Sequence, residues 1–218
     1  MSSGGPPRAL RSDARRNREK VVAAALEVFT ERGLDAPLED IARRAGVSIG
    51  TLYNRFPNRE ALLDEILPDL IAAQVEAGRE ALAHPDPWEG FVLFVTRTCE
   101  LQARSRALTD ALSMRFERAE RLAEACHRGL SDVAAIIDRA REHGSLRPDF
   151  TPADLVYIIW SNARVVEATA SVAPDTWRRN LAFVLDGLRA DAAHPIAEPP
   201  MTPEQVDAAM RALAADRR

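Results

Sequence analysis

The amino-acid sequence predicts an all-α protein in which a three-helix N-terminal domain precedes a larger C-terminal helical domain. Apolar residues recur at helical spacing along most of the 218 residues, as amphipathic helices require. Alternating Val/Ile/Thr runs and Asn-Gly turns, which would indicate strands and hairpins, are absent beyond residue 59. We expect a flexible basic arm (1–13), the N-terminal domain (14–60), the larger domain (61–192), and a linker with a short C-terminal helix (193–218).

The segment 38–63, LEDIARRAGVSIGTLYNRFPNREALL, predicts two short helices joined by a tight turn. Ile41 and Ala42 begin an apolar face at helical spacing, and the small Ala42 allows a second helix to cross closely. Gly46 suits the left-handed conformation that ends a helix and turns the chain. Ser48 then offers a hydroxyl to the free amides of the next helix, as an N-cap does.

The second of these helices, expected from Ile49 to about Phe56, has a buried and a polar face. Leu52 and Phe56 are expected in the core, and the polar face presents Thr51, Tyr53, Asn54 and Arg55. A polar second helix after a short glycine turn is typical of the helix-turn-helix, which lays that helix in the major groove. The alternative is an ordinary helical hairpin with a solvated polar face.

The side chains of this segment divide by chemistry into base and phosphate contacts. Asn and Arg pair bidentately with adenine and guanine edges, and Thr offers a methyl or a hydroxyl. Phosphate contacts position a protein without specifying sequence. The candidates for bases are Thr51, Asn54 and Arg55. The candidates for phosphates are Ser48, Tyr53 and Arg59.

Two motifs in this segment, GTLYNRF and then NREALL, are highly specific. With the preceding VVAAALEVFTERGLDAPLEDIARRAGVS they make residues 21–67 resemble the tetracycline-repressor (TetR) family of bacterial transcription regulators. The resemblance implies a phosphate contact from Arg59. It implies base or phosphate contacts from Ile49, Gly50, Thr51, Tyr53, Asn54 and Arg55.

The first of the two short helices departs from the family pattern at its start. Many members have a Thr where this chain has Pro37-Leu38. Proline suits a first helical turn, but the cap hydroxyl and its phosphate contact are missing. Glu39 is acidic and is not expected to touch DNA. Base contacts should therefore come from the second helix, helped by the arm.

The charge of the chain is unevenly divided. The formal net charge of the whole chain is −4. Residues 1–60 contain 11 Lys/Arg and 8 Asp/Glu, a net charge of +3. Residues 61–218 contain the other 18 Lys/Arg and 25 Asp/Glu, a net charge of −7. A basic end on an acidic body fits a protein that touches phosphate with one end only. The basic residues that crowd the first twenty positions are Arg8, Arg11, Arg15, Arg16, Arg18 and Lys20. They form either a solubilising tail or an arm that folds against DNA on binding.

The remainder is expected to be helical, with start signals at Asn58, Thr151-Pro152 and the capping box Thr202-Pro203-Glu204-Gln205. The expected helices cover about 59–83, 88–104, 107–116, 118–143, 152–171, 175–192 and a short segment after residue 202. The resemblance implies a homodimer through residues 152–192, whose two helices would form a four-helix bundle with their counterparts. Otherwise these helices are simply more core. A two-fold dimer would also double the contacts on a palindromic DNA operator.

The resemblance also implies a small-molecule effector held inside the larger domain. Aromatic and apolar candidates for the pocket are Trp88, Phe91, Phe94, Met114, Phe116, Tyr157, Trp160 and Trp177. Polar candidates that fall between apolar positions are Arg97, Asn162, Arg164 and Glu167. Because a buried charge needs a partner, a ligand carboxylate near an Arg is one expectation. The alternative for the whole set is plain core packing.

Pro68 lies ten residues after the cap Asn58, inside the helix that joins the two domains. Proline there removes a hydrogen bond to the carbonyl of Asp64 and should kink or break the helix. We expect this residue to be the hinge through which a ligand changes the spacing of the two DNA-binding ends. The alternative is a static bend.

Other classes of function find little support. The histidines His84, His127, His143 and His194 are scattered without HExxH spacing, and a glycine-rich phosphate loop is absent. Cys99 and Cys126 form no metal-binding pattern. A membrane-spanning apolar run and a signal-peptide core are also lacking. We expect no cofactor, no metal and no membrane partner, and a cytoplasmic bacterial setting.

The sequence therefore predicts a ligand-responsive DNA-binding regulator rather than an enzyme. We expect a repressor that binds double-stranded DNA at a palindromic operator and is released by a small molecule. The alternatives are an architectural DNA-binding protein without a ligand and a helical enzyme that acts on a small molecule.

Overall fold

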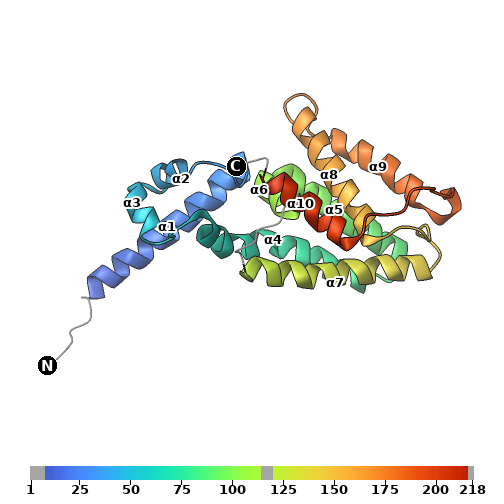
Figure 1. Ribbon diagram of the computed structural model, residues 1–218, viewed down its shortest axis with the longest axis horizontal. Helices are drawn as coiled ribbons and strands as arrows, with labels where there is room; N and C mark the ends of the chain where they lie inside the picture. Colours follow the sequence, from blue (N-terminus) through green and yellow to red (C-terminus); the bar gives the residue numbers. More distant parts are fainter. Residues whose placement is uncertain (1–7, 114–119, 216–218) are drawn as a thin grey trace.

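The computed structural model describes residues 8–113 and 120–215, which form helices and connecting loops (Figure 1). Within these ranges there is no strand, and a single isolated bridge joins Leu146 to Arg189. The all-α fold class is confirmed. The helices are α1 (Arg8–Arg32), α2 (Leu38–Ala45), α3 (Ile49–Tyr53), α4 (Arg59–Ala83), α5 (Pro87–Arg104), α6 (Arg106–Ser113), α7 (Glu120–Glu142), α8 (Pro152–Thr169), α9 (Thr176–Leu188), the 3-10 turn η1 (Ala190–Ala192) and α10 (Pro203–Ala215).

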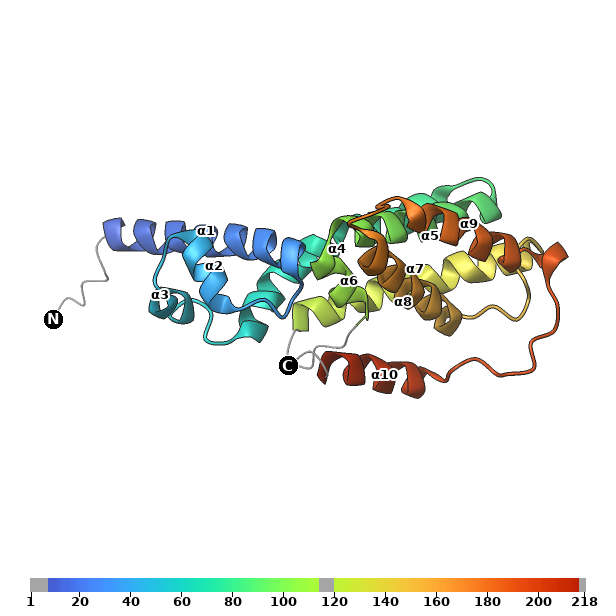
Figure 2. The same cartoon turned by 90° about the horizontal axis from the view of Figure 1, so that it is seen from above.

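Two apolar cores divide the molecule. The first is built by α1, α2, α3, the first part of α4 and, from farther along the chain, α6. The second is built by the last part of α4 with α5, α7, α8 and α9. Figures 1 and 2 show α1, α2 and α3 at one end of an elongated molecule, α6 near its middle, and α4 running from the first group into the second. Helix α4 is therefore shared by both cores.

The long helix α4 is fixed at both ends. The side chain of Asn58 accepts a hydrogen bond from the Ala61 N–H at 2.8 Å, as the sequence predicts. At the other end, Arg139 of α7 donates to the carbonyl of Leu82 at 3.0 Å and reaches the carbonyls that follow it. A cation at a helix C-terminus satisfies the carbonyls that have no partner within the helix. Helix α4 and helix α7 are thus joined where the chain turns into α5.

Pro68 does not break α4, which runs without interruption from Arg59 to Ala83. The missing N–H is tolerated because the neighbours Leu67 and Ile71 are buried in the first core and hold the helix on either side. None of the helices in the described part of the chain is long and apolar enough to cross a membrane.

Three expected boundaries differ from the structure. Helix α1 begins at Arg8, so residues 8–13 of the expected arm are helical, consistent with the high helix propensity of its Arg, Ala and Leu residues. Helix α3 ends at Tyr53, because the N–H groups of Arg55 and Phe56 both bond to the Leu52 carbonyl and Phe56 precedes a proline. Helix α9 ends at Leu188, where the chain pairs with residues 145–147.

The C-terminal helix α10 follows a linker without regular structure and lies along the larger domain (Figure 2). Its capping box is confirmed: the Thr202 N–H donates to Gln205 Oε1 at 2.8 Å, and the Gln205 N–H donates to Thr202 Oγ1 at 3.3 Å. Within α10, all of which is described, Met210 is the buried residue. One apolar side chain therefore anchors this helix.

Candidate DNA-binding surface and ligand pocket

The turn between α2 and α3 has the geometry that the sequence predicts. Gly46 ends α2 in the left-handed conformation with φ 67°, and the Val47 N–H donates to the Ala42 carbonyl at 3.0 Å. Ser48 caps α3, its Oγ accepting from the Thr51 N–H at 3.1 Å. The same Oγ lies 2.8 Å from Thr51 Oγ1. The two hydroxyls therefore orient each other at the start of α3.

Helix α3 exposes most of the residues expected to contact DNA. Leu52 and Phe56 are buried in the first core, as expected. Tyr53, Asn54 and Arg55 are exposed at the opposite side of the helix end. Ile49 departs from this pattern: it is half-buried and packs against the first core. The described surface thus presents a hydroxyl, a phenol, an amide and a guanidinium together.

Helix α2 begins without a capping hydroxyl, and ion pairs join it to α1. Pro37 stands at its N-cap position and offers no side-chain acceptor. Arg44 forms ion pairs with Glu27 and Glu31 of α1, each at 3.0 Å, and Arg44 lowers the pKa of Glu31 through a hydrogen bond. Exposed ion pairs contribute little stability individually. They do orient α2, and therefore α3, on the first helix.

Arg59 has a different environment from the one expected of a phosphate contact. Its Nη1 donates to the carbonyls of Leu34 at 2.7 Å and Ala36 at 2.8 Å, which lie in the loop after α1. The guanidinium also lies over the ring of Phe29, 5.9 Å from its centroid. Burial lowers the pKa of Arg59 from its ordinary value, although an Arg remains protonated at neutral pH. These bonds join the start of α4 to the loop after α1.

The basic residues near the N-terminus are partly engaged within the protein. Arg18 forms an ion pair with Glu65 at 2.8 Å and lies over the ring of Phe56. Arg15 approaches Glu19 at 3.6 Å on the same helix. Residues 1–7 lie outside the described residues, so both interpretations of the arm stay predictions.

The two domains meet at a buried carboxylate. Asp110 of α6 is 2% exposed, and its Oδ2 accepts from the Leu34 N–H at 2.8 Å. Gly33 has φ 93°, and a Cβ at that position would lie 2.7 Å from Asp110 Oδ2. Only glycine adopts this conformation readily and allows such a close approach. Asp110 thus connects the end of α1 directly to α6. The sequence pattern offered no indication of this contact.

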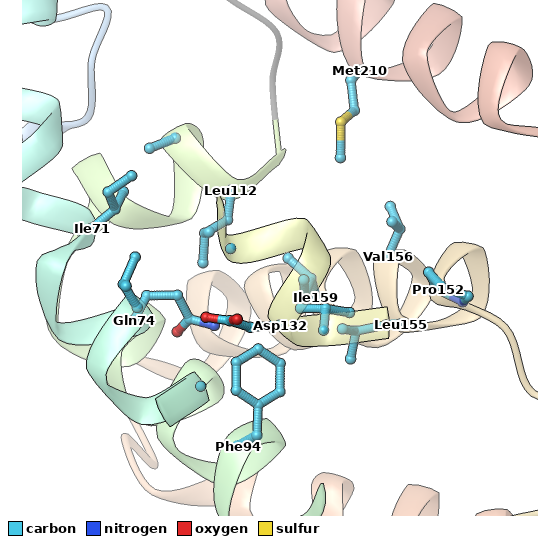
Figure 3. A pocket seen from close by; sticks show the side chains of 15 residues that line it. Ile71, Gln74, Phe94, Leu112, Asp132, Pro152, Leu155, Val156, Ile159 and Met210 are labelled. Carbon is cyan, nitrogen blue, oxygen red and sulfur yellow. The ribbon is translucent and has the colours of Figure 1, made fainter. Parts of the chain in front are cut away.

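A pocket of about 120 Å³ lies in the larger domain between α4, α5, α6, α7, α8 and α10 (Figure 3). Most of its described wall is apolar. The apolar residues that line it include Ile71, Phe94, Leu112, Leu155, Val156 and Met210. Two polar side chains, Gln74 of α4 and Asp132 of α7, also line it. Among the described residues, no group of three His, Cys, Asp or Glu could hold a metal ion.

Few of the predicted pocket residues lie at this pocket. Phe94 does line it. Trp88, Phe91 and Trp177 are buried in the second core. Met114 and Phe116 lie outside the described residues, and the prediction for them remains untested.

The charged candidates Arg97 and Arg164 do not line this pocket. Arg97 and Arg164 are exposed and pair with Glu100 and Glu167 on their own helices. Polar residues between apolar positions also mark the edge of a buried face, which explains both cases.

The remaining candidates on α8 also lie away from the pocket lining. Tyr157 is 42% exposed, and Trp160 is half-buried. Asn162 is buried, but it donates to Gln102 Oε1 at 3.0 Å and so joins α8 to α5. These three residues do not belong to the described wall. The sequence did not predict Gln74 and Asp132 as pocket residues, because helices α4 and α7 contain no aromatic residue that would indicate a pocket.

Cys99 is free, buried and chemically protected. Burial raises the pKa of its thiol to about 12. The reactive form of cysteine is the thiolate, so this residue is unsuited to redox sensing.

Comparison with known proteins assigns both halves of the chain. Residues 21–66 match the family described as bacterial regulatory proteins of the tetR family. Residues 86–190 match a second family, the C-terminal domain of SbtR-like transcriptional regulators. The matched segments cover 28%, 54% and 42% of the first three curated relatives, so the chain aligns with only part of each.

Individual relatives agree with this assignment. The repressor KstR of Mycolicibacterium smegmatis is 31% identical over 110 residues, 49% of this chain and 54% of that protein. A TetR regulator of Streptomyces coelicolor of known structure is 33% identical, covering 79% of this chain and 98% of that one, with a TM-score of 0.46.

A more distant structure shares the fold. The ketosteroid regulator KstR2 of Mycobacterium tuberculosis, 20% identical, covers 80% of this chain and 95% of its own with a TM-score of 0.55. The helix-turn-helix geometry and the two family matches, over residues 21–66 and 86–190, agree: this chain belongs to the TetR family of bacterial transcription regulators.

Proposed function

We propose that this protein is a ligand-responsive DNA-binding regulator that represses transcription from a palindromic operator as a homodimer. The observation that carries the proposal is that Asn54 and Arg55 are exposed at the end of α3. The Ser48 cap and the buried Leu52 fix the position of the helix that presents them. An exposed second helix of this kind fits the major groove. Thr51 adds a third candidate for base contacts, while Ser48, Gly50 and Tyr53 add backbone and hydroxyl groups for phosphates.

The homodimer would use α8 and α9. Large apolar side chains are exposed there: Tyr157 is 42% exposed and Phe183 is 64% exposed, with Val172 of the connecting loop at 80%. Exposed apolar patches mark interaction sites. A two-fold dimer would pair residues 152–192 with their counterparts and present two copies of α3 to the DNA.

Selection of bound sequences from random duplex DNA tests the function directly. We expect full-length protein to enrich a palindrome with half-sites about one helical turn apart. Binding without any preferred sequence would favour the architectural alternative. Turnover of a small molecule in the absence of sequence-specific binding would favour the enzyme alternative, which nothing in the geometry supports.

Two substitutions at the C-terminal end of α3 and just after it test the assignment of base contacts. We expect Asn54→Ala and Arg55→Ala each to weaken binding to the selected operator by about 1–3 kcal/mol and to relax preference at one half-site position. Fluorescence anisotropy on a set of single-base operator variants measures both effects. Arg79→Ala, which removes an exposed Arg far along α4, is the matched control and should leave affinity unchanged. If affinity fell equally for every operator variant, these residues would instead contact phosphates.

We further propose that Pro68 is the hinge that transmits ligand binding to the DNA-binding end. It lies in α4 just before Ile71, which belongs to the first core and also lines the pocket. A proline weakens the helix at this point because it donates no hydrogen bond. A ligand that displaces Ile71 would therefore bend α4 most easily at Pro68.

Replacing Pro68 by alanine tests the hinge. We expect operator affinity without ligand to be unchanged and the ligand concentration needed for release to rise, because the restored hydrogen bond stiffens α4. Operator release measured against ligand concentration gives the result. The exposed neighbour Asp69→Ala is the control. Identical ligand responses in Pro68→Ala and the parent protein would show that the residue is only a static bend.

A further inference from the structure

The pocket is small and largely apolar, which limits the size of what it can hold. Its volume is about 120 Å³, close to the roughly 150 Å³ of an apolar protein cavity that binds benzene. Phe94 and Leu155 line it from the second core, and Met210 closes it from α10 (Figure 3). A ligand with one ring or a short branched chain matches this space.

The orientation of the Gln74 amide is set by its neighbours. Thr98 Oγ1 donates its single hydrogen to the Phe94 carbonyl at 2.8 Å. It can therefore only accept from Gln74, whose Nε2 lies 2.7 Å away. The other end of the amide, Oε1, is buried without a hydrogen-bond partner among the described residues. A buried acceptor without a partner is costly, so the pocket contains an acceptor that needs a donor.

Asp132 supplies a second acceptor at the same wall. A Cβ placed on Gly78 would lie 3.6 Å from Asp132 Oδ2 and 3.8 Å from Phe94 Cε2. The carboxylate and the aromatic ring therefore face the same stretch of α4, one turn after Gln74 (Figure 3). Among the described residues that line the pocket there is no Lys, Arg or His. This part of the wall accepts hydrogen bonds and carries negative charge.

We propose that the effector is a ring-sized, mostly apolar amine whose ammonium group binds Gln74 Oε1 and Asp132. The inference rests on the proposed function, since it names the chemical class of that regulator's ligand. A buried cation requires an opposite charge and hydrogen-bond acceptors, and both side chains provide them. The ring of Phe94 adds an attractive surface for a cation. The ligand carboxylate expected from the sequence would instead face Asp132 and be repelled.

Three matched probes separate these possibilities: phenethylamine, phenethyl alcohol and phenylacetate share a ring and differ in their polar group. Calorimetry with the full-length protein measures each affinity. We expect the amine to bind more tightly than the alcohol by about tenfold or more, because charge-assisted hydrogen bonds are roughly twice as strong as neutral ones. We expect the carboxylate to bind weakest. Equal or tighter binding of phenylacetate, or no binding of any probe, overturns the proposal.

Variants locate the site. Asp132→Asn should abolish the preference for the amine over the alcohol, whereas Asp138→Asn, an exposed acid on the same helix, should preserve it. Gly78→Ala places a methyl group at ordinary contact distance from Asp132 and Phe94. That methyl should occupy part of the pocket and reduce binding of amine and alcohol alike without unfolding α4, since Ala favours a helix over Gly. Unchanged amine preference in Asp132→Asn contradicts the assignment.

DNA binding provides an independent readout. Suppose that the amine binds, that Asp132→Asn loses the preference for the amine over the alcohol, and that no operator can be selected. The pocket assignment then holds and the proposed regulatory function fails. If an operator is selected but the amine neither binds nor releases it, the regulatory function holds and the ligand class is wrong. The two failures are therefore distinguishable.

Discussion

Arg59→Ala is expected to lower the free energy of unfolding by about 1.5–3 kcal/mol, the range for hydrogen bonds made by charged groups. The guanidinium binds the carbonyls of Leu34 and Ala36 and covers the ring of Phe29. Alanine removes these contacts and leaves the loop after α1 without its attachment to α4. Chemical denaturation followed by circular dichroism measures the loss.

Operator affinity of Arg59→Ala should also fall, as a consequence of that loss. Arg55→Ala is the contrasting variant, because Arg55 is exposed. It should weaken DNA binding while leaving the free energy of unfolding unchanged. If Arg59→Ala instead kept full stability and lost affinity equally for all DNA sequences, Arg59 would be a phosphate contact, as the family resemblance implied.

Asp110→Ala is expected to destabilise the protein by about 1–3 kcal/mol, the cost of a buried donor left without a partner. The donor is the Leu34 N–H, which bonds to Asp110 Oδ2 at 2.8 Å. Because Asp110 joins α6 to the end of α1, its loss should also weaken the coupling between ligand and DNA. Thermal unfolding and ligand-dependent operator release measure the two effects separately.

The conservative variant Asp110→Asn serves as the control for that experiment. Its amide oxygen can still accept from the Leu34 N–H, so stability and ligand response should be largely retained. Ala111 and Leu112 line the pocket next to Asp110, which places the ligand one residue from the interdomain contact. A normal ligand response in Asp110→Ala would show that coupling runs through α4 alone.

The features predicted correctly from the sequence depend on near neighbours along the chain. Gly46 and Ser48 define the turn, and Asn58 and Thr202 cap their helices, through hydrogen bonds that span a few residues. The burial of Leu52 follows from helical spacing in the same way. The end of α3 differs from the predicted one: the helix stops at Tyr53, three residues before Phe56, which is followed by a proline.

The features that only the tertiary structure decided depend on residues far apart in sequence. Arg59 bonds to carbonyls 23 and 25 residues away, and Asp110 to an amide 76 residues away. The pocket draws its wall from several helices, so its acceptors Gln74 and Asp132 have no common pattern. Local hydrogen bonding and periodicity therefore determined the helix-turn-helix and the exposed polar residues at the end of α3. Helix packing decided which charged groups bind within the fold, which side chains line the pocket, and how the two ends are joined.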